Sequence, residues 1–398
     1  MSETRVGERR APHHGARTVG WLELFYDLVF VAGIVTFSDA VSFAAEGNVI
    51  AVVTAAFAAV WWIWVTTTLF ANRFRTDDLG QRALILVQMM LLTLISLVVG
   101  DGAGRHEGFL STAYALLCVD VAVMHAREVR RSAGARAAFA IARRNEFAIA
   151  TLPFLASALI SGPARYVLWV IGLATIVVPV VAYRFGRVEG EVPIDEDHLV
   201  ERFGLLTIIV CGESFVKVSL LASDGSLESL DLIVLGALFV LVFSMWWSYF
   251  DDIPEGGLPS GIGRLRGWFL GHLFLQVFLV GVAVGYSKLL RLDLGDSIDL
   301  DKMLLAVGPL IGVYLSLALV GACTRRTPVG PMLALRLGSA AALVPIGILI
   351  WRVDWIEVEA SAILLAVFAL VHGGLAALLR RRTRVLPVSV PTPTPAAD

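Results

Sequence analysis

Apolar residues along this chain form long blocks that are separated by short polar or charged segments. An α-helix needs about 20 consecutive apolar residues to cross the hydrocarbon core of a bilayer. Windows of this length predict an all-α membrane protein with about twelve transmembrane helices. The expected spans lie near residues 21–44, 49–70, 83–101, 108–126, 146–163, 166–184, 201–221, 230–250, 267–288, 303–324, 332–352 and 359–379.

Basic residues mark one side of the predicted membrane protein. They gather before the first span, in every second connection and after the last span. The other connections carry few basic residues or more acidic than basic ones. Because basic connections of membrane proteins stay in the cytoplasm, we expect twelve spans with both termini cytoplasmic. The basic clusters occupy residues 5–17, 73–82, 127–144, 264–266 and 380–384.

The two ends of the chain differ from the spans between them. Residues 1–20 are polar and basic and lack the apolar stretch of a signal peptide, so we expect a short cytoplasmic leader. Residues 385–398 are rich in proline and are expected to form an extended, disordered cytoplasmic tail.

The two halves of the chain share three features in the same order. Their offsets rise slowly, from 178 to 192 residues, as a duplication followed by loop insertions would leave them. We therefore expect two six-helix halves, at 21–184 and 185–384. Because six is an even number, the halves would run parallel, related by an axis along the membrane normal. The matched features are Glu23-x-Phe25 with Glu201-x-Phe203, Trp61-Trp62 with Trp246-Trp247, and Pro153 with Pro345.

The first span opens with two carboxylates, Glu23 and Asp27. A charge at bilayer depth is costly, so such residues usually face the bundle interior or a water-filled cavity. Residues four apart share a helix face, whereas Asp39 is rotated by about 120° from Asp27. Glu23 and Asp27 either line a polar cavity for a proton, a cation or a cationic substrate, or bond to arginines and tryptophan N–H groups. In the second case Glu23 lies at headgroup depth.

The seventh span carries Glu201 at its start and Glu213 within it. Glu213 and Lys217 are four residues apart, in the order that suits an intrahelical ion pair. They either neutralise each other or belong to a functional site. Gly212 precedes Glu213, and its missing side chain would allow the close approach of another helix or of a ligand.

Three further polar residues lie in or beside the expected spans. Asp120 is in the middle of the span 108–126, where an aspartate needs a partner. His198 and His272 could relay protons, because histidine titrates near neutral pH. A structural role is the alternative for all three residues.

Tryptophans cluster in the second and eighth spans. We expect Trp61, Trp62, Trp64, Trp246 and Trp247 to anchor the protein at the membrane interface, where this residue type is enriched. The alternative is an aromatic lining for a cation or an apolar ligand.

Composition and absent motifs exclude several classes of function. The chain is 57% hydrophobic and 17% charged, and no loop is long enough to hold a soluble domain. It lacks a Walker A loop, an HExxH motif and a GxSxG motif, so ATP-driven transport by this chain alone is not expected. Its three cysteines are scattered, without a CxxC pair, and are expected to be buried. We predict no cofactor, no metal, no catalytic motif and no nucleic-acid partner.

Three segments carry a resemblance to a known family. WLELFYDLVFV at 21–31, HLVERFGLLTIIVCGES at 198–214 and MWWSYFD at 245–251 resemble the bacterial low-temperature-requirement A (LtrA) family of multispanning membrane proteins. The resemblance implies a multi-pass protein of the bacterial plasma (inner) membrane, linked to growth in the cold or under stress. It does not imply a substrate. The motif positions are Glu23 and Asp27 in the first segment and His198, Glu201, Arg202, Gly204, Gly212 and Glu213 in the second.

Charged residues within the spans, duplicated halves and intramembrane prolines are typical of secondary transporters. We therefore favour a secondary transporter, or a permease coupled to protons or cations, for an unknown small solute or ion. A membrane-embedded enzyme that modifies lipids is the alternative, because the same carboxylates could act as acid and base at a headgroup. A stress or assembly factor without a substrate is the third class. The oligomeric state is left open.

A shared site for these acids follows from the expected symmetry. If an axis along the membrane normal relates the halves, the first and seventh spans occupy equivalent positions. Their acids would then converge on one polar cavity. Several buried acids need compensating cations, so at least one should rest against Arg202 or Lys217 or have a raised pKa. The converging acids would be Glu23, Asp27, Glu201 and Glu213, with Asp120 as a contributor.

Overall fold

The structure is a computed structural model that describes residues 19–43, 47–74, 76–101, 106–179, 192–223, 231–259, 261–290, 292, 296–324, 329–353 and 355–384. Within these ranges the chain forms twelve long helices, one short helix and a single isolated β-bridge between Ser297 and Glu357. The helices are α1 (Trp21–Phe43), α2 (Gly47–Phe74), α3 (Leu79–Gly100), α4 (Glu107–Val129), α5 (Gly134–Leu159), α6 (Pro163–Pro179), α8 (Glu196–Ser223), α9 (Asp231–Phe250), α10 (Ile253–Gly256), α11 (Ile262–Leu289), α12 (Leu300–Cys323), α13 (Val329–Arg352) and α14 (Val358–Arg384).

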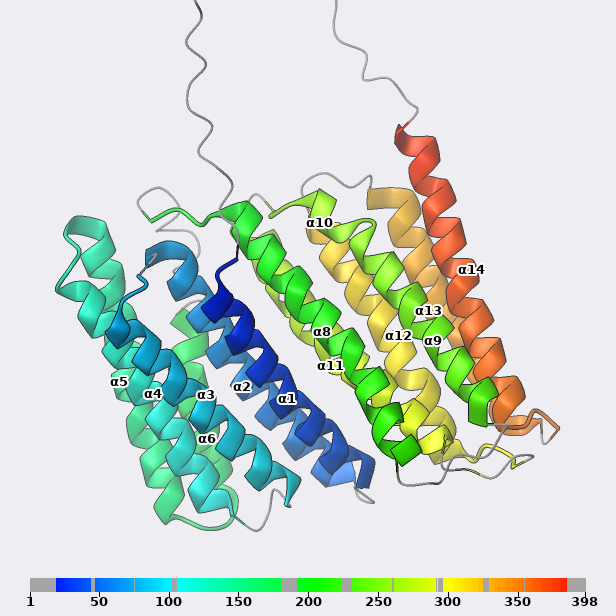
Figure 1. Cartoon of the computed structure of the whole chain (residues 1–398), viewed down its shortest axis with the longest axis horizontal. Helices are drawn as coiled ribbons and strands as arrows, with labels where there is room; N and C mark the ends of the chain where they lie inside the picture. Colours follow the sequence, from blue (N-terminus) through cyan, green and yellow to red (C-terminus); the bar gives the residue numbers. More distant parts are fainter. Residues whose placement is uncertain are drawn as a thin grey trace, which may run out of the picture.

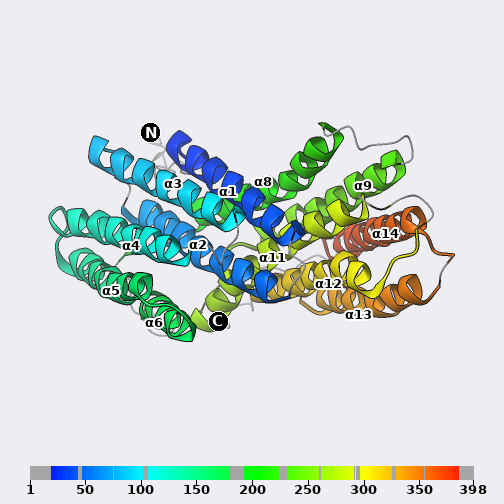
Figure 2. The same ribbon diagram turned by 90° about the horizontal axis from the view of Figure 1, so that it is seen from below.

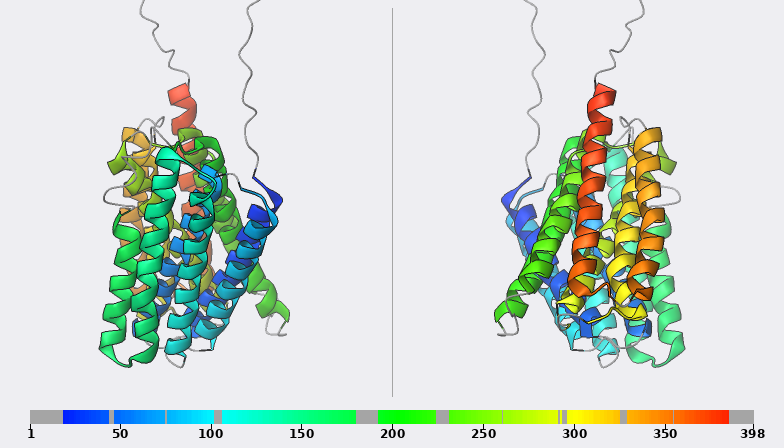
Figure 3. Two further views of the ribbon diagram at one scale, coloured as in Figure 1. Left: turned by 90° about the vertical axis from the view of Figure 1, so that its left-hand side faces the viewer. Right: turned by 90° about the vertical axis from the view of Figure 1, so that its right-hand side faces the viewer.

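The long helices lie side by side and run alternately in opposite directions (Figure 1). Two groups are visible from below, α1 to α6 on one side and α8 to α14 on the other (Figure 2). Figure 3 shows that most of the long helices run along one direction, while the blue helix α1 and the green helix α8 are tilted in opposite senses. The start of α1 and the end of α14 lie at the same end of the molecule (Figure 1). We call it the N-terminal end.

Nine of the twelve long helices in the described part of the chain are long and apolar enough to cross a membrane by length and composition. Many large apolar side chains on their outer faces are exposed, as in a protein whose surface contacts lipid. The chain is therefore an all-helical, multi-pass membrane protein. The three helices outside this set are α5, which begins with many arginines, α6, which has 17 residues, and α8, which begins with acidic residues.

One expected connection is largely helical. The arginines at 127–144 were assigned to a single cytoplasmic loop, but α4 ends at Val129 and α5 already begins at Gly134. Arg143 lies within α5 and is only 4% exposed. Its Nη1 contacts the Glu146 carboxylate at 2.5 Å and the Ile176 carbonyl oxygen at 3.4 Å. The loop assignment is wrong for Arg143 because an acid one turn away and a carbonyl of α6 satisfy its charge inside the bundle.

The packing order is similar in the two groups. In the first group α1 contacts α2 and α3, and α4 contacts α5. In the second, α8 contacts α9 and α11, and α12 contacts α13. The last helices differ, since α6 packs on α5 whereas α14 packs mainly on α9. The groups meet where α1 and α2 contact α8 and α11, and this is where the candidate site lies.

Close contact between α11 and α12 depends on a glycine. A Cβ atom added at Gly285 would lie 2.1 Å from the carbonyl oxygen of Leu305. Backbone atoms cannot move aside as a flexible side chain can, so only glycine allows the two helices to approach this closely.

Candidate functional site between helices α1 and α8

Helices α1 and α8 lie next to each other and are joined by polar contacts at three levels (Figure 1). The two members of each contact are 175 residues apart in the sequence. A constant separation means that the helices run parallel in a fixed register. The contacts are Glu23 with His198, Asp27 with Arg202 and Ser38 with Glu213.

Helix geometry explains why these contacts align. On α1 the polar residues are spaced by four and eleven positions, about one and three turns, so they share one face. The first and third levels are about 22 Å apart at 1.5 Å per residue. The same register places Val31 beside Leu206 and Ile34 beside Ile209, and all four belong to or pack against the apolar core. An apolar segment therefore separates the Asp27 level from the Glu213 level.

The middle contact is a buried ion pair. Arg202 Nη2 donates to Asp27 Oδ1 at 2.8 Å, and the two side chains are 2% and 0% exposed. Trp64 Nε1 donates to the same oxygen at 2.7 Å, and Arg202 Nη2 also lies 3.3 Å from Thr68 Oγ1. The guanidinium carbon is 5.8 Å from the centre of the Trp64 ring. The prediction that one of the intramembrane acids rests against Arg202 is confirmed.

This ion pair does not use its full hydrogen-bonding capacity. Asp27 Oδ2 and Arg202 Nε and Nη1 are buried and have no hydrogen-bond partner among the described residues. Desolvation of two charges is costly, and each polar atom left without a partner adds to that cost. Such an arrangement stabilises the fold less than a fully bonded pair would. It is typical of a site at which other groups are bound.

The first contact continues into α2. The Asp195 backbone N–H donates to Asn72 Oδ1 at 3.0 Å, which fixes the orientation of the amide. Asn72 Nδ2 therefore donates to His198 Nδ1, at 3.1 Å. Because Nδ1 is the acceptor, the ring proton of His198 is on Nε2, which contacts Glu23 Oε2 at 3.1 Å. Glu23 also accepts from the Gly20 backbone N–H at 2.9 Å.

A pocket of about 600 Å³ opens at the N-terminal end of the molecule and reaches Arg202, the cation of the Asp27–Arg202 ion pair. Its walls come from α1, α2, α3 and α8, and Glu23, Tyr26, Thr67 and Arg202 line it. Trp21 and Phe25 also line it and are 89% and 53% exposed, so its mouth carries aromatic surface. Within the described part of the chain, this pocket links the buried charges to the outside of the molecule.

Asp120 is linked to the same pocket through one glutamine. Gln88 Nε2 donates to Asp120 Oδ2 at 2.7 Å. Gln88 Oε1 accepts from Tyr26 Oη at 3.1 Å and from Thr67 Oγ1 at 2.9 Å, and both of these residues line the pocket. Asp120 on α4 is therefore connected to α1, α2 and α3 by a hydrogen-bond network.

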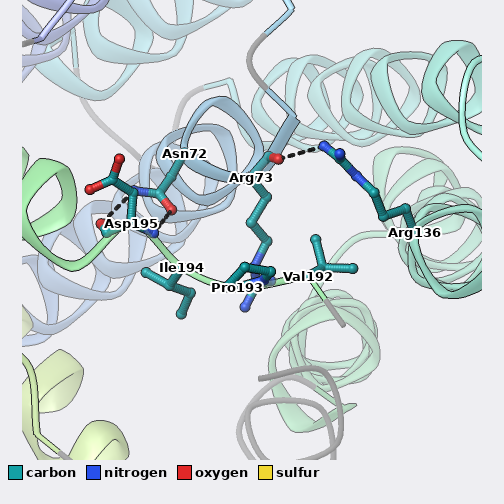
Figure 4. A pocket seen from close by; sticks show the side chains of 7 residues that line it. All are labelled: Asn72, Arg73, Arg136, Val192, Pro193, Ile194 and Asp195. Carbon is teal, nitrogen blue, oxygen red and sulfur yellow. Dashed lines mark hydrogen bonds between the residues drawn. The ribbon is translucent and has the colours of Figure 1, made fainter. Parts of the chain in front are cut away.

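A second pocket, of about 370 Å³, lies where α2 meets the segment before α8 (Figure 4). Figure 4 shows Arg73 and Arg136 on one side and Asp195 with Asn72 on the other. Arg136 Nη2 donates to the Arg73 carbonyl oxygen at 2.9 Å. Asn72 also contacts His198, which in turn contacts Glu23. This second pocket therefore adjoins the hydrogen-bonded series Asn72, His198 and Glu23.

The expected meeting of four acids at one cavity is not observed. Glu201 is exposed and lines a different pocket, together with Glu255 of α10. Glu213 accepts from Ser38 at the far end of α1, about 16 Å from the Asp27 level at 1.5 Å per residue. The prediction failed because residues 201 and 202 are rotated by about 100° from each other around α8, and Arg202 takes the position that faces Asp27 while Glu201 is exposed.

The close approach expected at Gly212 is not observed within the described part of the chain. A Cβ atom there would meet no described neighbour within 4 Å. The side chain of Lys217 lies outside the described residues. The predicted pair between Glu213 and Lys217 therefore stays a prediction.

Trp61 and Trp64 of α2 are not interfacial anchors. Trp61 and Trp64 are 1% and 0% exposed, and both lie between the two halves. Trp61 Nε1 donates to Gln276 Oε1 on α11 at 2.5 Å, and Trp64 Nε1 donates to Asp27. The interfacial interpretation failed because buried acceptors satisfy these N–H groups. In the eighth span, Trp246 is 38% exposed.

The sequence analysis did not predict the uncharged polar residues of the site. Thr67, Thr68 and Asn72 on α2, with Gln88 on α3, hold the charged residues in place. A usable signal was present, because the segment 66–72 places three threonines and an asparagine inside an apolar span. His272 is hydrogen-bonded within the second half of the chain. Its Nδ1 donates to the Trp268 carbonyl oxygen at 2.8 Å, and Tyr249 Oη lies 3.0 Å from its Nε2.

Comparisons with known proteins agree with this architecture. The chain is similar to an uncharacterised protein of Rhizobium meliloti (strain 1021), with 27% identity over 272 residues. That alignment spans 63% of this chain and 63% of the relative. Residues 18–377 match the sequence profile described as "Bacterial low temperature requirement A protein (LtrA)". The resemblance carried by the three segments is thereby confirmed, and the chain belongs to the bacterial low-temperature-requirement A family.

Proposed function

We propose that this protein is a secondary transporter that couples the movement of a solute to protons. The observation that carries the proposal is the ion pair between Asp27 and Arg202. It is buried between the two halves, lies beside a pocket open to one end of the molecule, and leaves three polar atoms without partners in the described structure. Buried ionisable residues at such a position are typical of ion and substrate pathways in membrane proteins.

The path through the protein follows α1 and α8. From the N-terminal end, a proton would reach the Glu23–His198 contact and then the Asp27–Arg202 pair at the next turn. The apolar segment around Val31 and Leu206 closes the path beyond this pair. Separation of α1 from α8 along this segment would connect Asp27 with the Ser38–Glu213 contact at the other end. Alternating access needs such a closed segment between two polar levels.

The membrane arrangement is part of the proposal. All twelve long helices cross the bacterial plasma membrane, in two parallel six-helix halves, with both termini in the cytoplasm. The arginine clusters support this, because the end of α4, the start of α5, the start of α11 and the end of α14 share the N-terminal end. Helices α5, α6 and α8 would cross while shielded by their neighbours. The pocket then opens to the cytoplasm.

Proton flux in proteoliposomes tests the function. The purified protein is reconstituted with a pH-sensitive dye inside, and pools of small metabolites are added outside. We expect some pools to cause proton movement with the unmodified protein and none to do so with Asp27→Asn. Glu201→Gln is the matched control, since it neutralises an exposed acid outside the site and should transport normally.

The outcome is interpretable only if the variant folds. Asp27→Asn leaves Arg202 buried without its counter-ion, so gel filtration and yield must match those of the unmodified protein. Equal flux through folded Asp27→Asn would contradict the proposal. A change in lipid composition without proton movement would also contradict it, and would favour an enzyme that modifies lipids.

A further inference from the structure

Two donor nitrogens of Arg202 have no described hydrogen-bond partner, and the residue lines the pocket. Its Nη2 is used by Asp27 and Thr68, while Nε and Nη1 are buried without partners among the described residues. A guanidinium is a planar fork of donors that matches the two oxygens of a carboxylate. Resting on the proposed function, we propose that the pocket binds a small organic carboxylate on Arg202, and that the substrate displaces Asp27, which then takes up a proton.

The walls of the pocket match an anion that carries an apolar group. Trp21, Phe25, Tyr26 and Ile85 supply aromatic and aliphatic surface, and Arg202 is the deep charged residue. Pockets of this kind hold the apolar part of a ligand while one or two polar groups fix its orientation. With a volume of about 600 Å³, the pocket has room for a ligand the size of an aromatic or medium-chain acid.

The other charges near the pocket are already paired within the protein. Glu23 on α1 contacts His198 on α8, and Arg82 on α3 forms two bonds to Asp77, at 2.8 and 3.0 Å. Arg202 is thus the buried cation of the pocket lining, and its Nε and Nη1 have no described partner.

Helices α2 and α3 present uncharged side chains near this level, and Gln88 of α3 separates Asp120 of α4 from Tyr26 of α1. Helix α2 presents Trp64 and Thr68. On α11, His272 is separated from Trp64 by the Phe203 ring, whose centre is 5.0 Å from each of the two rings. Asp27 is therefore the group that would bind or release a proton at this level.

Electrostatics makes the substrate and Asp27 competitors. A bound carboxylate beside the pair would leave two anions and one cation in a buried site, which is unfavourable. The charge balances when Asp27 leaves Arg202 and binds one proton from solution, so one proton accompanies each carboxylate. Trp64 can still donate to Oδ1 of the neutral acid, and Oδ2, which has no described partner, can carry the proton. Transport would then move no net charge.

Binding in detergent solution tests the substrate class without requiring transport. The probes are benzoate, an organic anion, and benzamide, its neutral counterpart of the same shape. Calorimetry should give a dissociation constant for benzoate that is at least about tenfold lower than that for benzamide. This is the loss of affinity expected when a charged hydrogen-bonded pair is removed. A pH dye in weak buffer should report about one proton taken up per benzoate bound, because Asp27 is the single competing acid at Arg202.

Variants separate the roles of the two residues. Asp27→Asn removes the competitor, so benzoate should bind about tenfold more tightly and proton uptake should vanish. The double variant Asp27→Asn with Arg202→Gln replaces the ion pair by neutral groups, and should fold but bind neither probe. Dodecanoate, added in the bilayer of nanodiscs, tests whether the carboxylate arrives from the membrane instead of from water.

The two proposals can fail separately. Equal affinity for benzoate and benzamide, or unchanged benzoate binding by the double variant, would overturn the carboxylate site. Proton flux that depends on Asp27 would still support transport in that case. Selective benzoate binding without flux in any proteoliposome assay would keep the site and overturn the transporter.

Discussion

At the scale of single residues, the charges of this protein are divided between two tasks. Asp27 and Arg202 form a pair that keeps unused donors and acceptors beside a pocket. Asp252 and Arg336 form a second buried pair, at 2.6 Å, in the second half, and Arg336 Nε likewise has no hydrogen-bond partner among the described residues. Arg336 Nη1 also donates to the Leu317 carbonyl oxygen at 3.0 Å, which ties α13 to α12. Burial alone does not distinguish the two tasks. The pocket lined by Arg202 is what makes the first pair a candidate site.

Asp78 gives a prediction about acid stability at the same scale. Its carboxylate caps α3 by accepting from the Gln81 backbone N–H at 2.8 Å, and it pairs with Arg127 and Arg131 at the end of α4. These contacts hold the pKa of Asp78 below its usual value, the largest contribution coming from the Gln81 N–H. The lowered pKa means that the charge stabilises the fold above about pH 4, and that this contribution disappears as the pH falls further.

We predict that the unfolding temperature depends less on acid pH when residue 78 carries no titratable carboxylate. Asp78→Asn keeps an N-cap residue but loses both ion pairs, so it should unfold at a lower temperature than the unmodified protein at neutral pH. The difference between the two should shrink as the pH falls to about 3. Thermal unfolding in detergent at several pH values measures this. A difference that stays constant with pH would show that the charge of Asp78 contributes nothing.

At the scale of helices, most of the architecture could be predicted, because the length of each apolar segment follows directly from consecutive residues in the sequence. Nine expected spans coincide with helices that are long and apolar enough to cross. The α5 boundary was missed by twelve residues, since Arg143 finds its partners on α5 and α6 and not in water. The sequence predicted only that at least one of the acids would rest against Arg202 or Lys217 or have a raised pKa, without naming Asp27 as the partner of Arg202. Nothing local in the sequence shows which residues of α8 face α1, 175 positions away.

The contact between α11 and α12 gives a prediction at this scale. Gly285→Ala would place a methyl group 2.1 Å from the Leu305 carbonyl oxygen, so the helices must move apart. We expect a loss of about 1–3 kcal/mol, typical of an overfilled contact, seen as a lower unfolding temperature. Gly308→Ala is the matched control on the neighbouring helix, because a Cβ atom there meets nothing within 4 Å. Equal unfolding temperatures for the two variants would show that the close approach is not needed.

At the scale of the whole molecule, the basic ends of the helices and the alternating direction of the chain lead to one orientation. Ser132 lies between α4 and α5 and Arg384 ends α14, both at the N-terminal end, whereas Gly162, between α5 and α6, lies at the other end. Alkaline phosphatase is active only outside the cytoplasm, so a fusion at Gly162 should be active and fusions at Ser132 and Arg384 inactive. This pattern requires that α5 and α6 cross the membrane, although neither is among the nine clearly apolar spans. Activity at Ser132 would reverse the orientation of the first half, and inactivity at all three sites would leave α5 and α6 on the cytoplasmic side. Because the pocket opens at the N-terminal end, the same three fusions decide from which side of the membrane a substrate reaches Arg202.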